Sequence, residues 1–350
     1  MFEITAGKYK IGDGQPPFII AEMSGNHNQA LARALKIVEA AAKAGAHALK
    51  LQTYTADTMT IDVDKKDFLI EDKKSLWKGR NLYELYRQAA TPWEWHKPIF
   101  DLCRKLGIIG FSTPFDETAV NFLESLNVPF YKIASFEIVD IPLIKKVAST
   151  GKPILISTGM SSVKEIKEAV TAARKSGSTD IVLLKCTSSY PASPENSNLK
   201  TIPNMRARFK CQVGLSDHTM GMSVALASIA LGATVIEKHF TLLRSDGGVD
   251  SAFSMEPLEM AELVAEAKIA WQALGKVSYC VTAQEKASLK FRRSLYVVKD
   301  MNAGEAFSNE NLRSIRPGYG LAPRYYDNLL GKKVKRDLKK GTPVGWEMIG

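Results

Sequence analysis

The amino-acid sequence predicts an α/β protein, a TIM (β/α)8 barrel followed by a small β-rich domain. Short apolar, β-branched runs alternate with amphipathic helical segments, and about eight such units fit the usual size of this barrel. The runs are apolar throughout, which is typical of parallel strands buried on both faces. From about Arg293 the pattern changes to short strands and turns. A doubly wound sheet is the alternative, but it does not usually need eight units.

The predicted strands follow one another at regular intervals. In chain order they are Phe18–Met23, Ala46–Gln52, Ile108–Ser112, Phe130–Ser135, Pro153–Thr158, Asp180–Cys186, Gln212–Asp217 and Ala233–Phe240. Several of the intervening helices end in a glycine just before the next strand, where a left-handed cap is favoured: Gly45, Gly107, Gly177 and Gly232. We expect the last barrel helix at about Pro257–Leu274.

Two segments do not fit the repeat. Residues Asp57 to Thr91 separate the second strand from its helix, with a short helix expected at Leu82–Ala90, and so long a connection is usually functional or a lid. We predict a barrel domain over residues 1–275, a linker over 276–292 and a C-terminal domain over 293–350. The C-terminal domain could be a solubilising cap, but its RPGYG turn suggests a contact with the active site.

Composition favours an ordinary globular protein, with 45% hydrophobic and 24% charged residues among 350. The net charge of +10 suits an enzyme that captures an anionic small molecule. No aromatic-interleaved basic motif points to nucleic acid, and no signal peptide or membrane span is apparent. We therefore expect a cytoplasmic protein. The four cysteines are far apart, and we interpret them as small buried residues.

Polar side chains cluster at the predicted strand ends, where a TIM barrel places its active site. They are Glu22, Asn26, His27, Asn28, Lys50, Gln52, Thr113, Lys132, Ser135, Glu137, Ser157, Thr158, Gly159, Thr187, Ser188, Tyr190, Ser216, Asp217, His218, Glu237, Lys238 and His239. So many ionisable groups on one rim favour an enzyme over a binding scaffold.

His218 and His239 end neighbouring strands, and two imidazoles there, near Glu22 and Asp250, suit a divalent transition metal. A single histidine at a strand end is more often structural, and we interpret His47 and His96 in that way. His27 is expected to orient other groups or to lie next to the metal.

Lys50 and Lys132 point to the same mouth, together with several hydroxyls and Gly159, which suggests a clamp for phosphate and carboxylate groups. A single buried lysine would instead suggest a Schiff-base lyase. Glu137 is the best placed group for acid–base work or for stabilising a cation. Walker, GxGxxG and GxSxG motifs are missing from the sequence, so NTPase, dinucleotide-binding and serine-hydrolase functions have no support.

Eight ordered motifs carry a family resemblance from about residue 18 onward. AEMSGNHN, KLQTYTADTMT, FSTPFDE, YKIASFEIVDIPLI, ISTGM, LLKCTSSYP, GLSDHT and IEKHFTLLR resemble the sialic acid synthase family, and RRSLYVVKDMNAGE with IRPGYG resembles its antifreeze-like (SAF) domain. These motifs most resemble the pseudaminic acid synthase branch of the family. The chain has SFE and CTSSYP at positions where sialic and legionaminic acid synthases usually have SGE and CTNxYP.

The resemblance implies condensation of phosphoenolpyruvate with an open-chain amino sugar and release of phosphate; the pseudaminic branch uses 2,4-diacetamido-2,4,6-trideoxy-L-altrose. Glu137, Glu22 and Lys132 are the implied catalytic residues. Phosphoenolpyruvate would be held by Lys50, Thr113, Lys132, Ser135, Ser157, Gly159 and Ser216. The sugar would be held by Gln52, Tyr190, Asp250 and Arg316. His218 and His239 would bind the metal, manganese first, with magnesium or cobalt as alternatives.

Arg316 is implied to reach the barrel of a second subunit, which makes a domain-swapped homodimer the expected assembly. Leu243 departs from the family, which often has Asp before Arg244, so a contact supporting the metal or sugar could be lost. Phe136 and Ser188 alter the pocket that reads the sugar, and an apolar ring suits a 6-deoxy sugar. A legionaminic or N-acetylneuraminic acid synthase, a Schiff-base lyase and a non-catalytic sugar-binding module remain alternatives.

Overall fold

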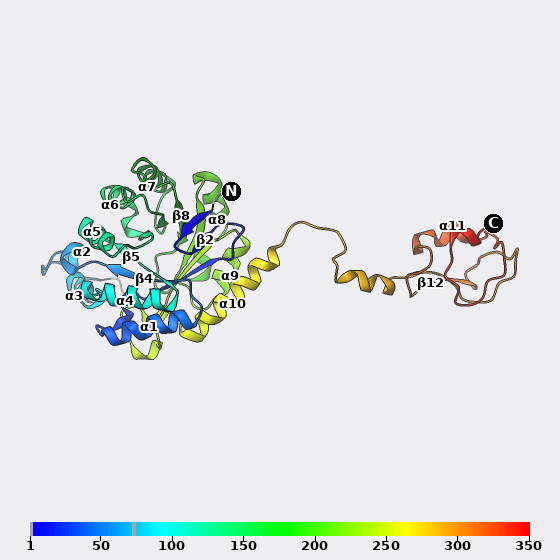
Figure 1. Ribbon diagram of the computed structural model, residues 1–350, viewed down its shortest axis with the longest axis horizontal. Coiled ribbons are helices and arrows are strands. Elements are labelled where there is room, and N and C mark those ends of the chain that lie inside the picture. Colours follow the sequence, from blue (N-terminus) through cyan, green and yellow to red (C-terminus); the bar gives the residue numbers. More distant parts are fainter. Residues whose placement is uncertain (1–2, 72–74) are drawn as a thin grey trace. The chain divides into compact units, whose positions relative to one another are not determined.

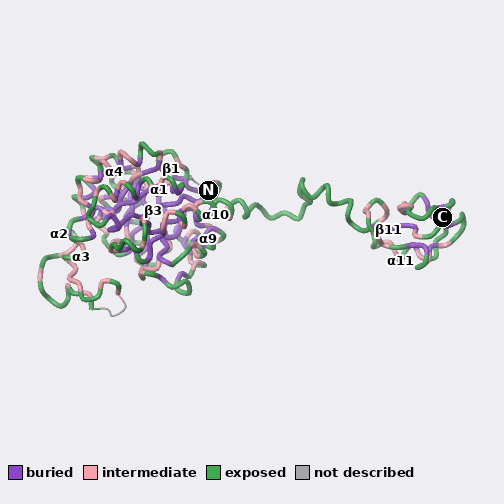
Figure 2. The backbone as a smooth tube through the Cα atoms, turned by 90° about the horizontal axis from the view of Figure 1, so that it is seen from below, coloured by how far each residue is buried: buried purple, intermediate pink, exposed green. Residues whose placement is uncertain are grey.

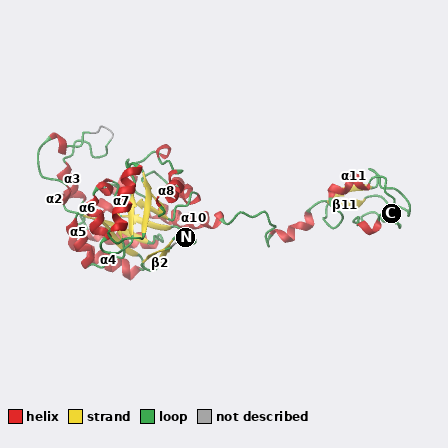
Figure 3. Cartoon of the chain, turned by 90° about the horizontal axis from the view of Figure 1, so that it is seen from above, coloured by secondary structure: helices red, strands yellow, loops and turns green. Residues whose placement is uncertain are grey.

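The computed structural model describes residues 3–71 and 75–350, and the chain divides into two compact units, Met1–Gly275 and Lys276–Gly350. The first unit is a closed barrel of eight parallel strands in the order β10-β3-β4-β5-β6-β7-β8-β9, surrounded by helices (Figures 1 and 3). The predicted TIM barrel is therefore confirmed.

The barrel strands lie within about two residues of their predicted positions. They are β3 Phe18–Glu22, β4 Ala48–Thr53, β5 Ile109–Pro114, β6 Tyr131–Ile133, β7 Ile154–Ser157, β8 Ile181–Cys186, β9 Gln212–Asp217 and β10 Val235–His239. The helices are α1 Leu31–Lys43, α2 Ala56–Met59, α3 Leu82–Ala89, α4 Trp93–Leu106, α5 Glu117–Ser125, α6 Ile141–Ala148, α7 Val163–Lys175, α8 Thr201–Phe209, α9 Ser223–Ala230 and α10 Pro257–Leu274. The four glycines proposed as caps all have positive φ, between 77° and 114°.

Side chains that point into the barrel change from apolar to polar along each strand. The lower part is filled by one apolar cluster: Phe18, Ile20, Ala48, Ile109, Phe111, Phe130, Leu155, Val182, Leu184 and Val235. Because successive side chains alternate between the two faces of a strand, two residues further on the same inner face carries Glu22, Lys50, Lys132, Ser157, Cys186 and Glu237. This alternation brings the candidate site residues to the open end.

The outward faces of the strands pack against the helices in a second, larger apolar cluster, which includes Leu49, Ile133, Ile156 and Leu215. Figure 2 colours the buried residues of the barrel unit purple. Lys238 is a charged residue on this side. It is buried, with its ammonium 2.9 Å from Asp217 Oδ2, and it donates to the carbonyls of Thr219 and Gly221. This ion pair replaces apolar packing at the top of β9 and β10.

An N-terminal hairpin, which the sequence pattern did not predict, closes the other end of the barrel. Strands β1 (Ile4–Ala6) and β2 (Tyr9–Ile11) pair antiparallel around a turn at Gly7, whose φ is +57°. Ile4 and Ile11 join the inner apolar cluster with the barrel residues. The barrel floor is thereby sealed by hydrocarbon.

The segment between β4 and α4 contains α2, a 3-10 turn at Lys66–Phe68 and α3, which ends one residue before the predicted Ala90. Leu69 and Asn81 form a β-bridge across this segment, and Trp77 Nε1 donates to the carbonyl of Val249, 3.0 Å away. Residues 72–74 lie outside the described residues. The insertion is therefore tied to the loop that follows β10.

The second unit is a small domain with its own core. Strands β11 (Ser294–Val297) and β12 (Leu312–Ile315) pair antiparallel, and α11 spans Tyr326–Leu329. Its core consists of Leu295, Val297, Met301, Phe307, Leu312, Leu329, Val334, Leu338, Val344 and Met348. Residues 276–291 before it are exposed and contain a 3-10 helix at Glu285–Phe291.

Within the described ranges, no helix combines the length and apolar character needed to cross a membrane. All four cysteines are free. Cys103, Cys186 and Cys211 are buried as predicted, but Cys280 is exposed, so the prediction was wrong for this residue because it lies in the open 276–291 segment.

Candidate active site

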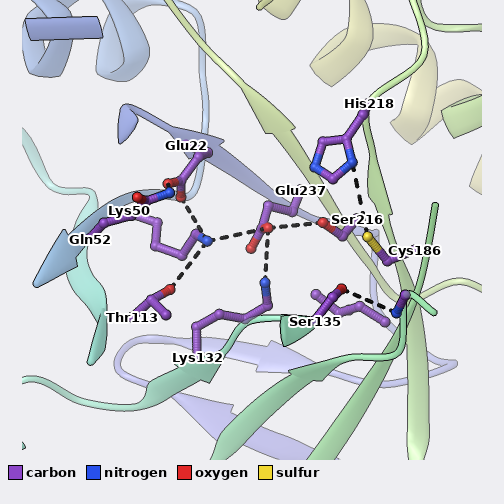
Figure 4. A network of polar contacts seen from close by, with 12 residues as sticks. Glu22, Lys50, Gln52, Thr113, Lys132, Ser135, Cys186, Ser216, His218 and Glu237 are labelled. Carbon is purple, nitrogen blue, oxygen red and sulfur yellow. Dashed lines mark hydrogen bonds and ion pairs between the residues drawn. The ribbon is translucent and has the colours of Figure 1, made fainter. Parts of the chain in front are cut away.

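Two buried lysines meet at one carboxylate oxygen inside the barrel (Figure 4). Oε1 of Glu237 lies 3.1 Å from Lys132 Nζ and 3.3 Å from Lys50 Nζ, and it accepts a hydrogen bond of 3.1 Å from Ser216 Oγ. Lys50 also pairs with Glu22 at 2.8 Å and donates to Thr113 Oγ1 at 3.3 Å. Strands β3, β4, β5, β6, β9 and β10 all contribute to this network.

The four charged groups of this network shift one another's pKa values. Burial raises the pKa of Glu22 to about 7, against the attraction of Lys50, and the negative charge of Glu237 adds to the rise. Burial disfavours the charged form of Glu237 too, but Lys132 and Lys50 together hold its pKa well below the usual range. Burial works against a charged Lys50, yet Glu22 and Glu237 raise its pKa above the usual value. Lys50 and Glu237 therefore form an ionised pair, with Glu22 close to its titration point.

Lys132 differs from Lys50 in its surroundings. Burial lowers the pKa of Lys132, and Glu237, the carboxylate that it contacts, opposes this shift. Two ammonium groups beside several hydroxyls form a pocket for a compact, multiply charged anion.

The hydroxyl side of the pocket is built by the strand ends of β6 and β7. The backbone N–H of Gly159 donates to Ser135 Oγ at 3.1 Å. A Cβ atom at Gly159 would lie 2.2 Å from Ser188 Oγ and 2.7 Å from Ser135 Oγ, so a glycine is required by this close approach. Ser157 Oγ is buried without a hydrogen-bond partner among the described residues. It is thus available to a ligand.

Glu137 lies one turn beyond β6, in the 3-10 helix Phe136–Val139. Burial raises the pKa of Glu137 to about 7, and the nearby Lys132 opposes the shift. Its Oε2 atom is buried and has no hydrogen-bond partner in the described part of the chain. A carboxylate poised near neutral pH, with one free oxygen, suits proton transfer or the stabilisation of a developing cation.

His218 and His239 lie side by side at the barrel mouth, with ring centroids 5.2 Å apart and planes at 62°. His218 Nδ1 donates to the carbonyl of Thr187 at 3.0 Å, which leaves Nε2 as the acceptor. Burial, reinforced by His218, lowers the pKa of His239 well below its usual value, so this ring is neutral. Within the described residues its Nδ1 has no hydrogen-bond partner, and Asp250 Oδ2 lies 3.7 Å from it.

These features fit a metal held by two imidazoles, because an unpaired buried ring nitrogen and an oriented neighbour are the donors a divalent transition ion needs. Among residues 3–71 and 75–350, no group of three or more His, Cys, Asp or Glu is arranged to hold a metal.

Of the remaining barrel residues predicted to bind the sugar, Tyr190 and Asp250 lie beside this histidine pair and Gln52 lies beside Glu22. Gln52 Nε2 donates to Glu22 Oε1 at 3.0 Å, and Asp250 accepts a hydrogen bond from Ser24 Oγ. The ring of Tyr190 lies 4.5 Å from that of His218 and 5.8 Å from that of Trp77. A cavity of about 540 Å³ opens beside this wall, lined by Gly25, Asn28, Gln29, Leu76, Trp77, Arg80, Gln88, Gly248, Val249 and Ala252.

The other residues singled out in the sequence are Arg316, in the second unit, and three histidines, in the first. Arg316 follows β12 in the second unit, where it is exposed and, within the described residues, makes no ion pair. His27 contacts Thr91, packs against Trp95 and accepts a hydrogen bond from the Gln29 N–H, so its predicted role beside the metal stays a prediction. His47 accepts from the Ile19 N–H, and His96 contacts Thr53, as expected of structural residues.

The two departures from the family pattern are exposed. Leu243 is 50% exposed, and the adjacent Arg244 pairs with Glu259 at 2.6 Å. Phe136 is 58% exposed beside Glu137.

Glu237 is the functional residue that the sequence analysis missed. It appeared among the strand-end polar residues without a role, yet it contacts both lysines. The available signal was its position two residues before His239, which places both side chains on the inner face of β10. Cys186 was also missed. Its thiol lies 4.0 Å from His218 Nδ1; burial opposes its ionisation, but His218 and Lys132 lower its pKa to about 7.

Comparisons with known proteins agree with this geometry. Residues 37–279 match the NeuB family, and residues 292–350 match the SAF domain. The chain is 44% identical to a pseudaminic acid synthase of Campylobacter jejuni over 93% of this chain and 95% of that protein. It is 38% identical to an N,N'-diacetyllegionaminic acid synthase of Legionella pneumophila over 97% and 96%.

A solved structure of N-acetylneuraminic acid synthetase from Leptospira borgpetersenii superposes with a TM-score of 0.73 at 33% identity, covering 83% of this chain and 96% of that one. This chain therefore belongs to the NeuB, or sialic acid synthase, family of phosphoenolpyruvate-dependent nonulosonic acid synthases.

Proposed function

We propose that this protein is a pseudaminic acid synthase, which joins phosphoenolpyruvate to 2,4-diacetamido-2,4,6-trideoxy-L-altrose and releases phosphate. The observation that carries the proposal is its identity of 44% to a pseudaminic acid synthase, against 38% to a legionaminic acid synthase of similar coverage. The exposed ring of Phe136 beside Glu137 supports it, because an apolar surface there suits a 6-deoxy sugar.

The pocket of Lys50, Lys132 and the neighbouring hydroxyls would hold the phosphate and carboxylate of phosphoenolpyruvate. Ser157 Oγ is a free donor for this anion, and Thr113, Ser135 and Ser216 already contact the network. Gln52, Tyr190 and Asp250 would orient the sugar aldehyde above it. His218 and His239 would hold a divalent metal, manganese in the simplest case, which supplies Lewis-acid polarisation of the aldehyde when bound.

Carbon 3 of phosphoenolpyruvate then attacks the aldehyde carbon, and positive charge develops at carbon 2. The Glu137 carboxylate would stabilise that charge and take a proton from the water that adds to carbon 2. Phosphate leaves with the bridging oxygen. The atoms of the reactants, which are phosphoenolpyruvate, the sugar and water, thus equal those of the products, which are the nonulosonic acid and phosphate. Glu22, with its raised pKa, is placed to hold or release a proton near the aldehyde oxygen.

A Schiff-base mechanism has less support, because it needs a neutral lysine. Lys50 pairs with Glu22 and Glu237, which favour its charged form, and Lys132 also contacts Glu237. Arg316 would complete the sugar site from the second subunit of a domain-swapped homodimer, since it is exposed and free to bind a partner group.

The test is a substrate panel. The purified protein, Mn²⁺ and phosphoenolpyruvate are incubated separately with the L-altrose derivative, the 2,4-diacetamido-2,4,6-trideoxy-D-mannose analogue and N-acetylmannosamine, and phosphate release is measured. We expect the highest kcat/KM with the L-altrose derivative. A preference for either other sugar would reject the pseudaminic assignment and leave the family assignment intact.

A further inference from the structure

Glu237 is a buried carboxylate at the centre of a pocket that must bind an anion. Its side chain is 3% exposed and comes from the inner face of β10, two residues below His239. A negative charge in this place weakens the attraction for phosphoenolpyruvate, so its presence needs a compensating role.

The contacts of Glu237 indicate that role. One oxygen, Oε1, lies 3.1 Å from Lys132 Nζ and 3.3 Å from Lys50 Nζ, and it accepts a hydrogen bond of 3.1 Å from Ser216 Oγ. The other oxygen, Oε2, has no hydrogen-bond partner in the described ranges. Two ammonium groups repel each other, and both are attached to flexible four-carbon side chains. A shared acceptor oxygen brings them to one point despite this repulsion.

The two lysines depend on Glu237 to different degrees. Lys50 retains Glu22 at 2.8 Å and Thr113 as alternative partners. Among the described carboxylates, Lys132 is ion-paired with Glu237 alone. Loss of the Glu237 charge should therefore affect Lys132 first.

We propose that Glu237 is a positioning residue of the phosphoenolpyruvate pocket, whose Oε1 atom fixes the ammonium groups of Lys50 and Lys132 at a common point for the anionic substrate. The proposal rests on the reaction of the family and not on the identity of the sugar. A failure of the substrate panel therefore leaves it standing, and its own failure leaves the pseudaminic assignment untouched.

Lys132 provides a signature in the pH profile. Burial already lowers its pKa, and the Glu237 charge limits that fall, so Glu237→Gln lowers the pKa further. The other titratable groups around Lys132 stay in place: Glu22 on β3, Lys50 on β4, Glu137 after β6, Cys186 on β8 and His239 on β10. The alkaline limb of kcat/KM for phosphoenolpyruvate should consequently move to lower pH.

The experiment compares Glu237→Gln, Glu237→Asp and a control, Glu124→Gln. Glu124 accepts from Tyr131 and pairs with Lys152 beside α5, at the strand-start end of the barrel, so its substitution removes a carboxylate without touching the pocket. Steady-state phosphate release gives kcat and the KM of each substrate across pH. Thermal-shift titration with phosphoenolpyruvate alone gives a readout that does not depend on turnover.

For Glu237→Gln we expect the KM of phosphoenolpyruvate to rise at least tenfold, the KM of the sugar to change less than threefold, and the alkaline limb to shift to lower pH. Glu237→Asp, which keeps the charge, should return the alkaline limb toward wild type. If Glu237→Gln does not fold, the KM of phosphoenolpyruvate and the KM of the sugar are compared in Glu237→Asp instead. An unchanged phosphoenolpyruvate KM, or equal losses for both substrates in a folded variant, would overturn the proposal.

Discussion

Gly159→Ala tests the close packing of the hydroxyl side of the pocket. The added methyl would lie 2.2 Å from Ser188 Oγ and 2.7 Å from Ser135 Oγ, so both hydroxyls must rotate away. Rotation of Ser135 Oγ breaks its 3.1 Å hydrogen bond from the Gly159 N–H, which leaves a buried donor unpaired at a cost of about 1–3 kcal/mol. Each 1.4 kcal/mol lost from ligand binding is about a tenfold change in affinity.

We therefore expect Gly159→Ala to raise the KM of phosphoenolpyruvate about 10–100-fold. The folded state should lose about 1–3 kcal/mol, as is usual for overpacking. The assays are phosphate release with phosphoenolpyruvate varied, and urea unfolding followed by circular dichroism. The KM of the sugar should change much less.

Gly110→Ala is the matched control. A Cβ atom at Gly110 would lie 2.5 Å from Phe100 Cδ1, on the outer side of β5 against α4. It should lose comparable stability while the phosphoenolpyruvate KM stays at the wild-type value. The reasoning is refuted if Gly159→Ala also loses stability but keeps the wild-type KM, because the clash would then be relieved without disturbing Ser135.

Four further predictions rest on the described contacts. Burial raises the pKa of Glu137 to about 7, above its unfolded value, so the protonated side chain stabilises the fold below about pH 4.5 and this contribution is lost as pH rises through 7. Glu137→Gln should therefore raise the free energy of unfolding at pH 8 by about 1–3 kcal/mol while abolishing activity. Equal stabilities of the variant and the wild type at pH 8 would contradict this. The same group predicts that wild-type kcat falls as pH drops through about 7, measured by phosphate release. Lys238→Met leaves Asp217 buried without its cation and should cost about 3–5 kcal/mol in urea unfolding, whereas a loss below 1 kcal/mol would show that the pair is dispensable. Chelation should remove activity, Mn²⁺ should restore it in the wild type but not in His239→Ala, and restoration in that variant would exclude His239 as a ligand.

The fold was predictable because its signals are local. Continuous apolar strands and glycine caps depend on the few residues around them, and β9 (Gln212–Asp217) was predicted to the residue. The hairpin of β1 and β2 was not, since three-residue strands such as ITA and YKI carry no periodicity and are stabilised only by the barrel residues that they cover.

The sequence predicted which residues lie at the open end of the barrel, but not which of them contact one another. Alternation along strands put Lys50, Lys132 and Ser216 on the inner face, and the structure brings them together. The convergence on Glu237 could not be predicted, because it depends on the stagger between non-adjacent strands and on side-chain length.

The sealed floor of the barrel has a kinetic consequence. Since the N-terminal hairpin closes one end, reactants and products share a single entrance. The lysine pocket at Glu237 lies two residues, about 6–7 Å of strand, beneath His239. Under the proposed function, a sugar bound at the mouth next to His239 and Tyr190 would cover the lysine pocket. Phosphoenolpyruvate would then have to bind before the sugar, and phosphate would leave after the nine-carbon product. A compulsory order of addition and release would thus follow from the shape of the barrel, since the chemistry of the proposed reaction alone requires none.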